Sequence, residues 1–273
     1  MGWSDRHIEI KTPEQIALMR VAGLLVGETL ELLRAAVRPG VTTGELDALA
    51  EDNIRSHGGV PSFKGYSHPP FPGTICASVN DEVVHGIPGS RELAEGDVIS
   101  IDCGAIVDGW HGDAAITVPV GEVPEDVQEL MRVTEESLWR GLAAAHLGGR
   151  VSDISHAIET YVRSEGRYGI LEEYTGHGIG TEMHMPPNVP NIGRRGRGPK
   201  LVEGMALAVE PMVTLGSKRT ALLDDEWTVV TSDGSRAAHF EHTFTLTPSG
   251  TWVLTAVDGG EGRLAELGVR FGG

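Results

Sequence analysis

The sequence predicts an α+β fold, in which an antiparallel sheet carries helices packed on its outside. Three observations lead to this prediction. Helical segments with recognisable caps alternate with strand-rich segments, one of these segments forms a clear hairpin, and a stretch of the first half recurs in the second. Such a recurrence indicates an internal repeat, with two halves related by a pseudo-two-fold axis.

The first two expected helices are marked by their caps. Thr12-Pro13-Glu14-Gln15 has capping-box spacing with proline at the first helical position, and it predicts a helix that ends before Pro39-Gly40. Thr42 and Glu45 repeat the capping box and predict a second helix, which ends at about residues 57–59.

A β-hairpin is expected over residues 98–118. Two strand-rich runs flank Asp108-Gly109, a favoured two-residue turn. This turn pairs Val107 with Trp110 and thereby fixes the register of the two strands.

In that register Asp102 and Asp113 are diagonal neighbours on one face. Asp113 lies opposite Gly104, which shares a face with Asp102 because side chains alternate along a strand. The missing side chain of Gly104 leaves space above the strand that suits a pair of metal ions. The alternative is a hairpin that carries two unrelated, exposed acids.

Two more helices are expected in the second half, from Pro124 to about Leu147 and from Ser152 to about Gly166. The candidate ligands named below then all fall in strands or loops, which suits a rigid site built on a sheet. A glycine-rich tail occupies residues 258–273.

The internal repeat is read from two aligned segments. Residues 93–102 match residues 201–210 position for position, with Leu, Glu and Gly identical and an acid at the end of each. Each half, at about 12–120 and 124–250, therefore delivers one carboxylate, Asp102 or Glu210, from the same strand position. This places both acids near the pseudo-two-fold axis.

Composition is consistent with one catalytic domain over residues 1–273, since no Pro- or Ser-rich linker divides the chain and 40% of its residues are hydrophobic. The net charge of −17 disfavours DNA and anionic membranes as partners. The basic, glycine-rich segment 194–200 has two interpretations, a contact with ribosomal RNA or a solvated loop, and the solvated loop is favoured. We expect a monomer.

The two cysteines, Cys76 and Cys103, are too few for a disulfide framework, although one disulfide stays open. No N-terminal apolar signal segment and no run of transmembrane length is present. We therefore expect a cytoplasmic protein in a reducing compartment.

Five potential metal ligands stand in glycine- or strand-rich contexts. Four carboxylates gathered in a folded interior would repel one another, whereas two divalent cations would neutralise them. Two adjacent metal ions share a water, lower its pKa and polarise a carbonyl, which is the chemistry of a hydrolase. The sequence thus predicts a dinuclear site made by Asp102, Asp113, His177, Glu210 and Glu241.

From about residue 10 to residue 247 the chain resembles the type I methionine aminopeptidases. Five motifs in this order carry the resemblance, namely Asn80-Asp-Glu-Val-Val-His-Gly-Ile-Pro88, Ile101-Asp-Cys-Gly104 with Asp113, Gly176-His-Gly-Ile-Gly180, Val209-Glu-Pro-Met212 and Phe240-Glu-His-Thr243. The resemblance implies the pita-bread fold. It also implies removal of the initiator methionine from nascent polypeptides whose second residue is small.

The resemblance implies roles for individual residues. The five donors would bind two divalent ions, and one imidazole among oxygen ligands suits Co, Mn or Fe without selecting among them. His184 would contact the scissile carbonyl, His85 the departing nitrogen, and Glu210 would exchange a proton with the attacking water. Alternatives for these residues are a hydrogen-bonded structural histidine, a turn acid at Glu210 and a cross-strand ion pair at Glu241.

A pocket for the methionine side chain is also implied by the resemblance. It would be lined by Tyr66, Cys76 and Trp227, with Phe63 and Phe71 nearby, and aromatic edges and sulfur suit a thioether. Each of these residues is equally consistent with plain core. The sequence departs from the common family pattern at Phe63, where cysteine is frequent, and at Met183, where an aromatic residue is usual.

Two other functions are consistent with the same architecture. A proline-directed aminopeptidase or dipeptidase usually carries a large N-terminal domain ahead of the metal core and a different His-containing motif. A non-catalytic binding protein of this fold typically loses metal ligands, whereas all five candidates are present here.

Overall fold

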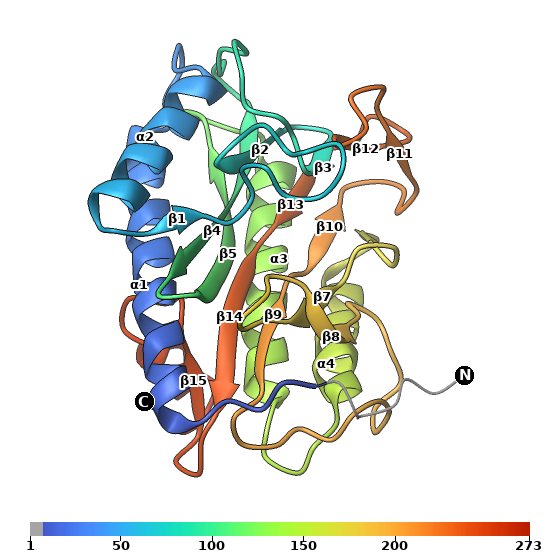
Figure 1. Ribbon diagram of the computed structural model, residues 1–273. Helices are drawn as coiled ribbons and strands as arrows, with labels where there is room; N and C mark the ends of the chain where they lie inside the picture. The colour runs from blue at the N-terminus through green and yellow to red at the C-terminus, as the bar shows by residue number, and fades with distance from the viewer. Residues whose placement is uncertain (1–7) are drawn as a thin grey trace.

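The computed structural model describes residues 8–273, so residues 1–7 of the predicted domain lie outside the described part (Figure 1). The four expected helices are present, together with a short fifth helix in the glycine-rich tail. Their bounds are α1 (Pro13–Ala36), α2 (Thr43–Ser56), α3 (Glu125–Ala144), α4 (Val151–Glu165) and α5 (Glu261–Glu266).

Both predicted capping boxes form. The Thr12 hydroxyl accepts a hydrogen bond from the Gln15 backbone N–H, and the Gln15 side chain accepts one from the Thr12 N–H. Helix α4 starts one residue earlier than expected, because the Arg150 N–H donates to the Asp153 carboxylate at 2.8 Å. The hydroxyl of Ser152, the expected first residue, instead accepts from the Arg197 N–H.

The strands form one large antiparallel sheet and two small ones. The large sheet has the strand order β1-β4-β5-β14-β9-β7-β8, with β2 paired to β4 and β15 paired to β14. Its strands are β1 (Val60–Pro61), β2 (Ile75–Val79), β4 (Val98–Val107), β5 (Trp110–Pro119), β7 (Gly176–Gly178), β8 (Met185–Val189), β9 (Ala206–Val209), β14 (Glu241–Leu246) and β15 (Thr251–Val253).

The two small sheets each hold three antiparallel strands. One is β13 (Ala237–His239), β10 (Met212–Thr214) and β6 (Gly169–Ile170), and the other is β11 (Thr220–Leu222), β12 (Val229–Thr231) and β3 (Glu82–Val84). They extend the main sheet on the side where β2 and β9 end (Figure 1).

The predicted hairpin register is confirmed, since Val107 pairs with Trp110 and Gly104 with Asp113. The interpretation of Gly104 was wrong. A Cβ atom there would lie 2.8 Å from the Phe63 ring and 2.9 Å from Ser62 Cβ, so protein atoms already occupy that space. The reason is that β1 pairs with β4 and the chain after β1 continues beside Gly104, where the Ser62 N–H donates to the Gly104 carbonyl.

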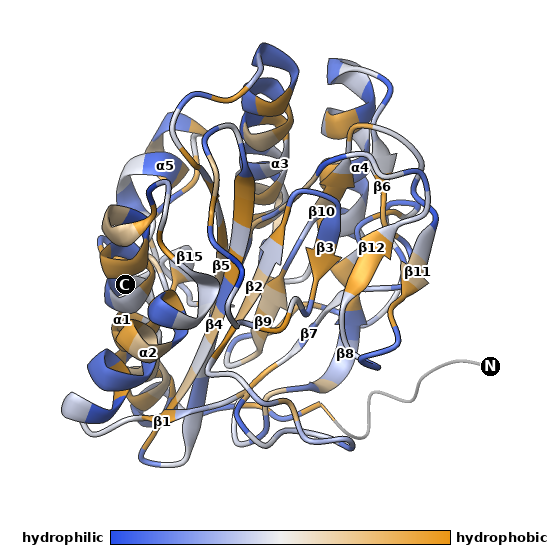
Figure 2. Cartoon of the chain, turned by 90° about the horizontal axis from the view of Figure 1, so that it is seen from above, coloured by the Kyte–Doolittle hydropathy of each residue, from blue (hydrophilic) through white to orange (hydrophobic). Residues whose placement is uncertain are grey.

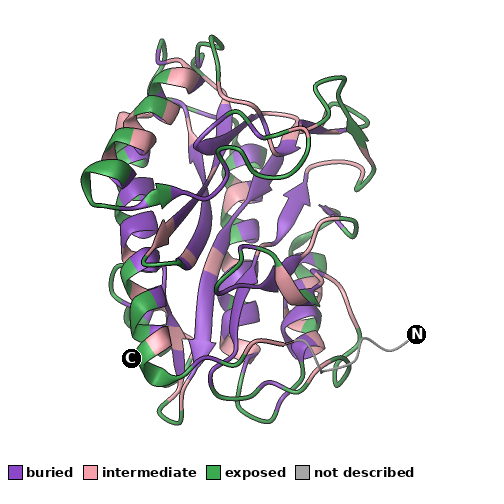
Figure 3. Cartoon of the chain, viewed as in Figure 1, coloured by how far each residue is buried: buried purple, intermediate pink, exposed green. Residues whose placement is uncertain are grey.

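The helices cover the outer side of the sheet, as expected. Helix α1 packs against β4 and β5, while α3 packs against α4 and β13. The central strands are hydrophobic and buried, whereas the sides of the helices that face away from the sheet are hydrophilic and exposed (Figures 2 and 3). The opposite side of the sheet is free to form a cavity.

Three smaller findings concern the C-terminal tail, the cysteines and the hydrophobicity of the helices. In the tail, Asp258 accepts hydrogen bonds from the N–H groups of Gly260 and Gly262, and Leu264 of α5 is fully buried. Cys76 and Cys103 are both free and buried. Among residues 8–273, no helix has the length and apolar character needed to cross a membrane.

Candidate active site

One cavity of about 260 Å³ brings the predicted site residues together. Its lining includes all of the proposed metal ligands, both accessory histidines and the five residues of the expected methionine pocket. Side chains from the two halves of the chain therefore meet in one place. Four further lining residues were not among the predicted site residues, namely Ser67, Tyr174, Thr175 and Met183.

The five candidate ligands come from adjacent strands of the large sheet. Asp102 on β4 and Glu241 at the start of β14 both lie across from Ala115 of β5, the strand that carries Asp113. His177 on β7 pairs with Ala208 of β9, and Glu210 follows the end of β9. Antiparallel pairing of these strands fixes the relative positions of all five side chains.

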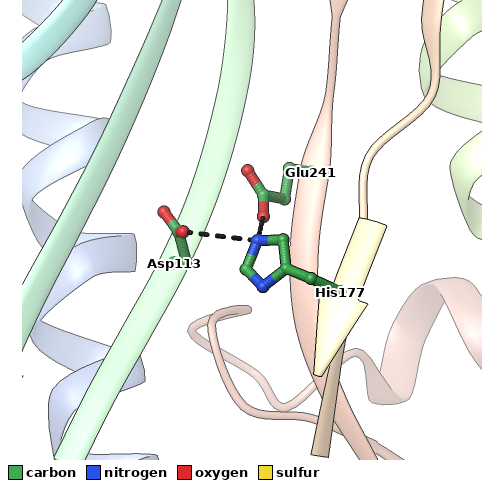
Figure 4. A group of neighbouring side chains, drawn as sticks. All are labelled: Asp113, His177 and Glu241. Carbon is green, nitrogen blue, oxygen red and sulfur yellow. Dashed lines mark ion pairs between the residues drawn. The ribbon is translucent and has the colours of Figure 1, made fainter. Parts of the chain in front are cut away.

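Donor atoms of Asp113, His177 and Glu241 face one another in the cavity (Figure 4), and Glu210 lies close to the same imidazole. His177 Nε2 lies 3.5 Å from Glu210 Oε1, 3.8 Å from Asp113 Oδ2 and 3.9 Å from Glu241 Oε1. These separations are too long for hydrogen bonds, but they suit atoms that share a bound cation.

Unsatisfied oxygens support the same conclusion. Asp102 Oδ1, Asp113 Oδ1 and Glu241 Oε1 are buried without a hydrogen-bond partner. Because buried carboxylate oxygens are normally paired, three orphaned oxygens in one cavity fit divalent metal binding. The alternative of two exposed acids does not apply, because Asp113 is only 3% exposed.

The electrostatics of the cluster also favour a bound cation. Burial raises the pKa of Asp102 from its usual value to about 7. Burial, together with repulsion from neighbouring carboxylates, also raises the pKa values of Asp113, Glu210 and Glu241. Burial lowers the pKa of His177 to about 3, which leaves its imidazole neutral and able to bind a metal ion.

The two accessory histidines approach the ligand cluster from loops. The His184 ring lies 4.3 Å from the His177 ring, centroid to centroid, and its Nδ1 is 2.7 Å from the Tyr66 hydroxyl. His85 follows β3 with a backbone φ of 59°, an uncommon conformation for a non-glycine residue. Its ring contacts the edges of Tyr174 and Trp227.

The apolar wall of the cavity is a separate hydrophobic cluster. Phe63, Phe71, Cys76 and Met183 are buried together, and Trp227 packs against them. Phe71 and Trp227 meet edge to face, with ring centroids 5.1 Å apart. The wall is thus built of aromatic edges and sulfur, directly beside the carboxylates.

Sequence reasoning missed His239. Its Nε2 is buried without a hydrogen-bond partner, 3.7 Å from Glu210 Oε2 and 3.9 Å from Glu241 Oε2. A signal was available, because His239 precedes Glu241 by two residues and alternation along an extended chain puts both on one face. Tyr174, in contrast, lies in a loop with no recognisable pattern.

Comparison with known proteins identifies the family. The model of "Metallopeptidase family M24" matches residues 17–248. The chain belongs to metallopeptidase family M24. Within this family it is 53% identical to a methionine aminopeptidase of Clostridium acetobutylicum over 91% of this chain and 98% of the relative. The resemblance read from the motifs is therefore confirmed.

Solved structures of similar proteins confirm the pita-bread fold. A crystal structure of methionine aminopeptidase from Thermotoga maritima superposes with a TM-score of 0.88 at 43% identity, covering 91% of this chain and 99% of that one. A prolidase from Pyrococcus furiosus has a TM-score of 0.72 at 22% identity, covering 92% of this chain and 66% of that one, and this likeness concerns the fold alone. Membership of a metallopeptidase family agrees with the divalent-metal cluster found here.

Proposed function

We propose that this protein is a methionine aminopeptidase that hydrolytically removes the N-terminal methionine from nascent polypeptides with a small second residue. One observation carries the proposal. A buried cluster of metal-binding side chains and an apolar wall of aromatic and sulfur-containing residues share a single cavity. The 53% identity to a named methionine aminopeptidase supports the same activity.

In this proposal Asp102, Asp113, His177, Glu210 and Glu241 hold two divalent ions, with Co, Mn and Fe as candidates. When bound, such ions act as Lewis acids and lower the pKa of water. Glu210, beside the reacting centre, accepts and returns a proton. His184 donates to the carbonyl oxygen and His85 to the departing nitrogen.

The apolar wall then determines which residue is released. Phe63, Phe71, Cys76, Tyr66 and Trp227 enclose the first side chain of the substrate. A small apolar pocket of this kind accepts the flexible thioether of methionine. It disfavours substrates whose first side chain is polar, because that side chain would find no hydrogen-bond partner there. We propose that the enzyme acts as a cytoplasmic monomer.

The basic segment 194–200 keeps both of its interpretations. Backbone N–H groups of Gly196 and Arg197 donate to Asp153 and Ser152 at the start of α4, so the loop is attached to the protein. The side chains of Arg194 and Arg195 are exposed. A solvated loop stays the favoured interpretation and a ribosome contact the alternative.

The function is tested by methionine release from Met-Ala-Ser, using metal-free protein titrated with Mn, Co or Fe. Asp113→Asn should lower the metal-dependent rate by at least about 100-fold, because it removes a ligand charge. Asp108→Asn is the matched control, since Asp108 is the exposed turn acid of the same hairpin. It should keep activity within about twofold.

The same assay separates the rival functions. Release from prolyl substrates, with none from Met-Ala-Ser, would replace the proposal by a proline-directed peptidase. Stoichiometric metal binding without release from any peptide would indicate a non-catalytic binding protein.

A further inference from the structure

Tyr66 makes a polar contact that a residue merely lining an apolar pocket does not need. It lies between β1 and β2, and its hydroxyl is 2.7 Å from Nδ1 of His184, which lies between β7 and β8. The backbone around Tyr66 is held by hydrogen bonds from the Tyr66 N–H to the Phe63 carbonyl and from the Phe71 N–H to the Tyr66 carbonyl. The hydroxyl is therefore presented to His184 by a fixed loop.

The direction of this hydrogen bond follows from the chemistry of its partners. A neutral imidazole has one N–H and one acceptor nitrogen, so Nδ1 of His184 either donates to the Tyr66 hydroxyl or accepts from it. The phenol of Tyr66 carries a proton at neutral pH and can donate it in a hydrogen bond. A phenol is a much stronger acid than a neutral imidazole N–H, which makes the phenol the donor and Nδ1 the acceptor.

We propose that Tyr66 is a positioning residue for His184, which holds the imidazole in the tautomer protonated at Nε2. Within residues 8–273, Nε2 of His184 has no protein hydrogen-bond partner. It is thus free to donate to the substrate's carbonyl oxygen as negative charge develops there. The inference rests on the proposed function, because that function gives His184 this contact.

Kinetics test whether the hydroxyl acts through His184. Tyr66→Phe keeps the ring that lines the pocket, so KM for Met-Ala-Ser should change little while kcat falls about five- to tenfold. In a His184→Gln background the same substitution should have no further effect, because the group it positions is gone. Equal rate losses in both backgrounds, or an unchanged kcat in Tyr66→Phe, would overturn the proposal.

A second readout does not depend on activity. Protein labelled with ¹⁵N-histidine and loaded with diamagnetic Zn²⁺ reports the tautomer of each imidazole, and His184→Gln assigns the His184 signals. The expected result is an unprotonated Nδ1 and a protonated Nε2 in the wild type, and a shift towards the other tautomer in Tyr66→Phe. A protonated Nδ1 in the wild type, or an identical spectrum in the variant, contradicts the inference.

Tyr174→Phe is the matched control, since Tyr174 lines the same cavity and its ring contacts His85 rather than His184. The Tyr174→Phe substitution also removes a phenol hydroxyl, but it should leave the His184 signals unchanged. The controls also separate two failures. An inactive wild type refutes the proposed function while the spectra still decide the tautomer, whereas an active wild type with unshifted spectra refutes only the role of Tyr66.

Discussion

Burial decides the chemistry of single residues around the cavity. The carboxylates resist ionisation and the histidines resist protonation, because water cannot solvate their charged forms. The same physics acts on Cys76, whose thiol lies in the apolar wall beside Asp102. Desolvation, reinforced by the neighbouring carboxylates, raises its pKa.

Both thiols are therefore expected to be unreactive in the folded protein. Iodoacetamide at about pH 7.5 should leave Cys76 and Cys103 unmodified, since alkylation requires an accessible thiolate. Intact-mass spectrometry would measure this, with protein unfolded in urea as the control in which both react. Rapid modification of Cys76 in the native state would show that the pocket opens more widely than the structure indicates.

At the scale of elements, the close contact of α1 with β5 holds in place the strand that carries Asp113. A Cβ atom at Gly112 would lie 2.7 Å from the Gly23 backbone nitrogen, so strand and helix touch backbone to backbone. Gly112 directly precedes Asp113. A shift of β5 would therefore displace a proposed metal ligand as well as loosen the core.

Gly112→Ala should consequently lower the free energy of unfolding by about 1–3 kcal/mol, because rigid backbone cannot yield to the added methyl group. Gly89→Ala is the control, since a Cβ atom at Gly89 would have no other atom within 4 Å. That control should change stability by less than about 0.5 kcal/mol. Urea unfolding measures both, and equal effects would contradict the close-contact argument.

For the whole molecule, the carboxylate cluster makes stability depend on metal and pH together. Burial raises the pKa of Asp102 to about 7, so the metal-free folded protein holds a proton that the unfolded chain releases. The stability that protonated Asp102 contributes to the folded state is fully present at low pH, and it is lost as pH rises from about 4 through about 7. Burial lowers the pKa values of His85 and His239 to about 4 and about 3. Both imidazoles are therefore neutral in the folded protein between about pH 5.5 and pH 8.

Removing the metal ions should therefore lower Tm more at about pH 8 than at about pH 5.5, by a difference of about 5 °C or more. Above the raised pKa values the carboxylates are all charged, and only bound cations offset their repulsion. Thermal unfolding with and without chelator at both pH values measures this. An equal loss at the two pH values would contradict it.

Local signals explain most of the successful predictions. Capping boxes and the Asp108-Gly109 turn involve neighbours in sequence, so the helix starts and the hairpin register were readable. The tail was less readable, because α5 depends on burial of Leu264 and on caps from Asp258. The relation between the two repeat halves stays a prediction.

The sequence by itself determined the four longer helices, the central hairpin, the family and the predicted site residues that gather in the cavity, since these depend on local chemistry and on motifs. Tertiary structure alone decided what fills the space beside Gly104, that His239 lies near Glu210 and that Tyr66 reaches His184. The physical reason is that these contacts join segments far apart in the chain. Their geometry is fixed by packing and strand order, which no local pattern encodes.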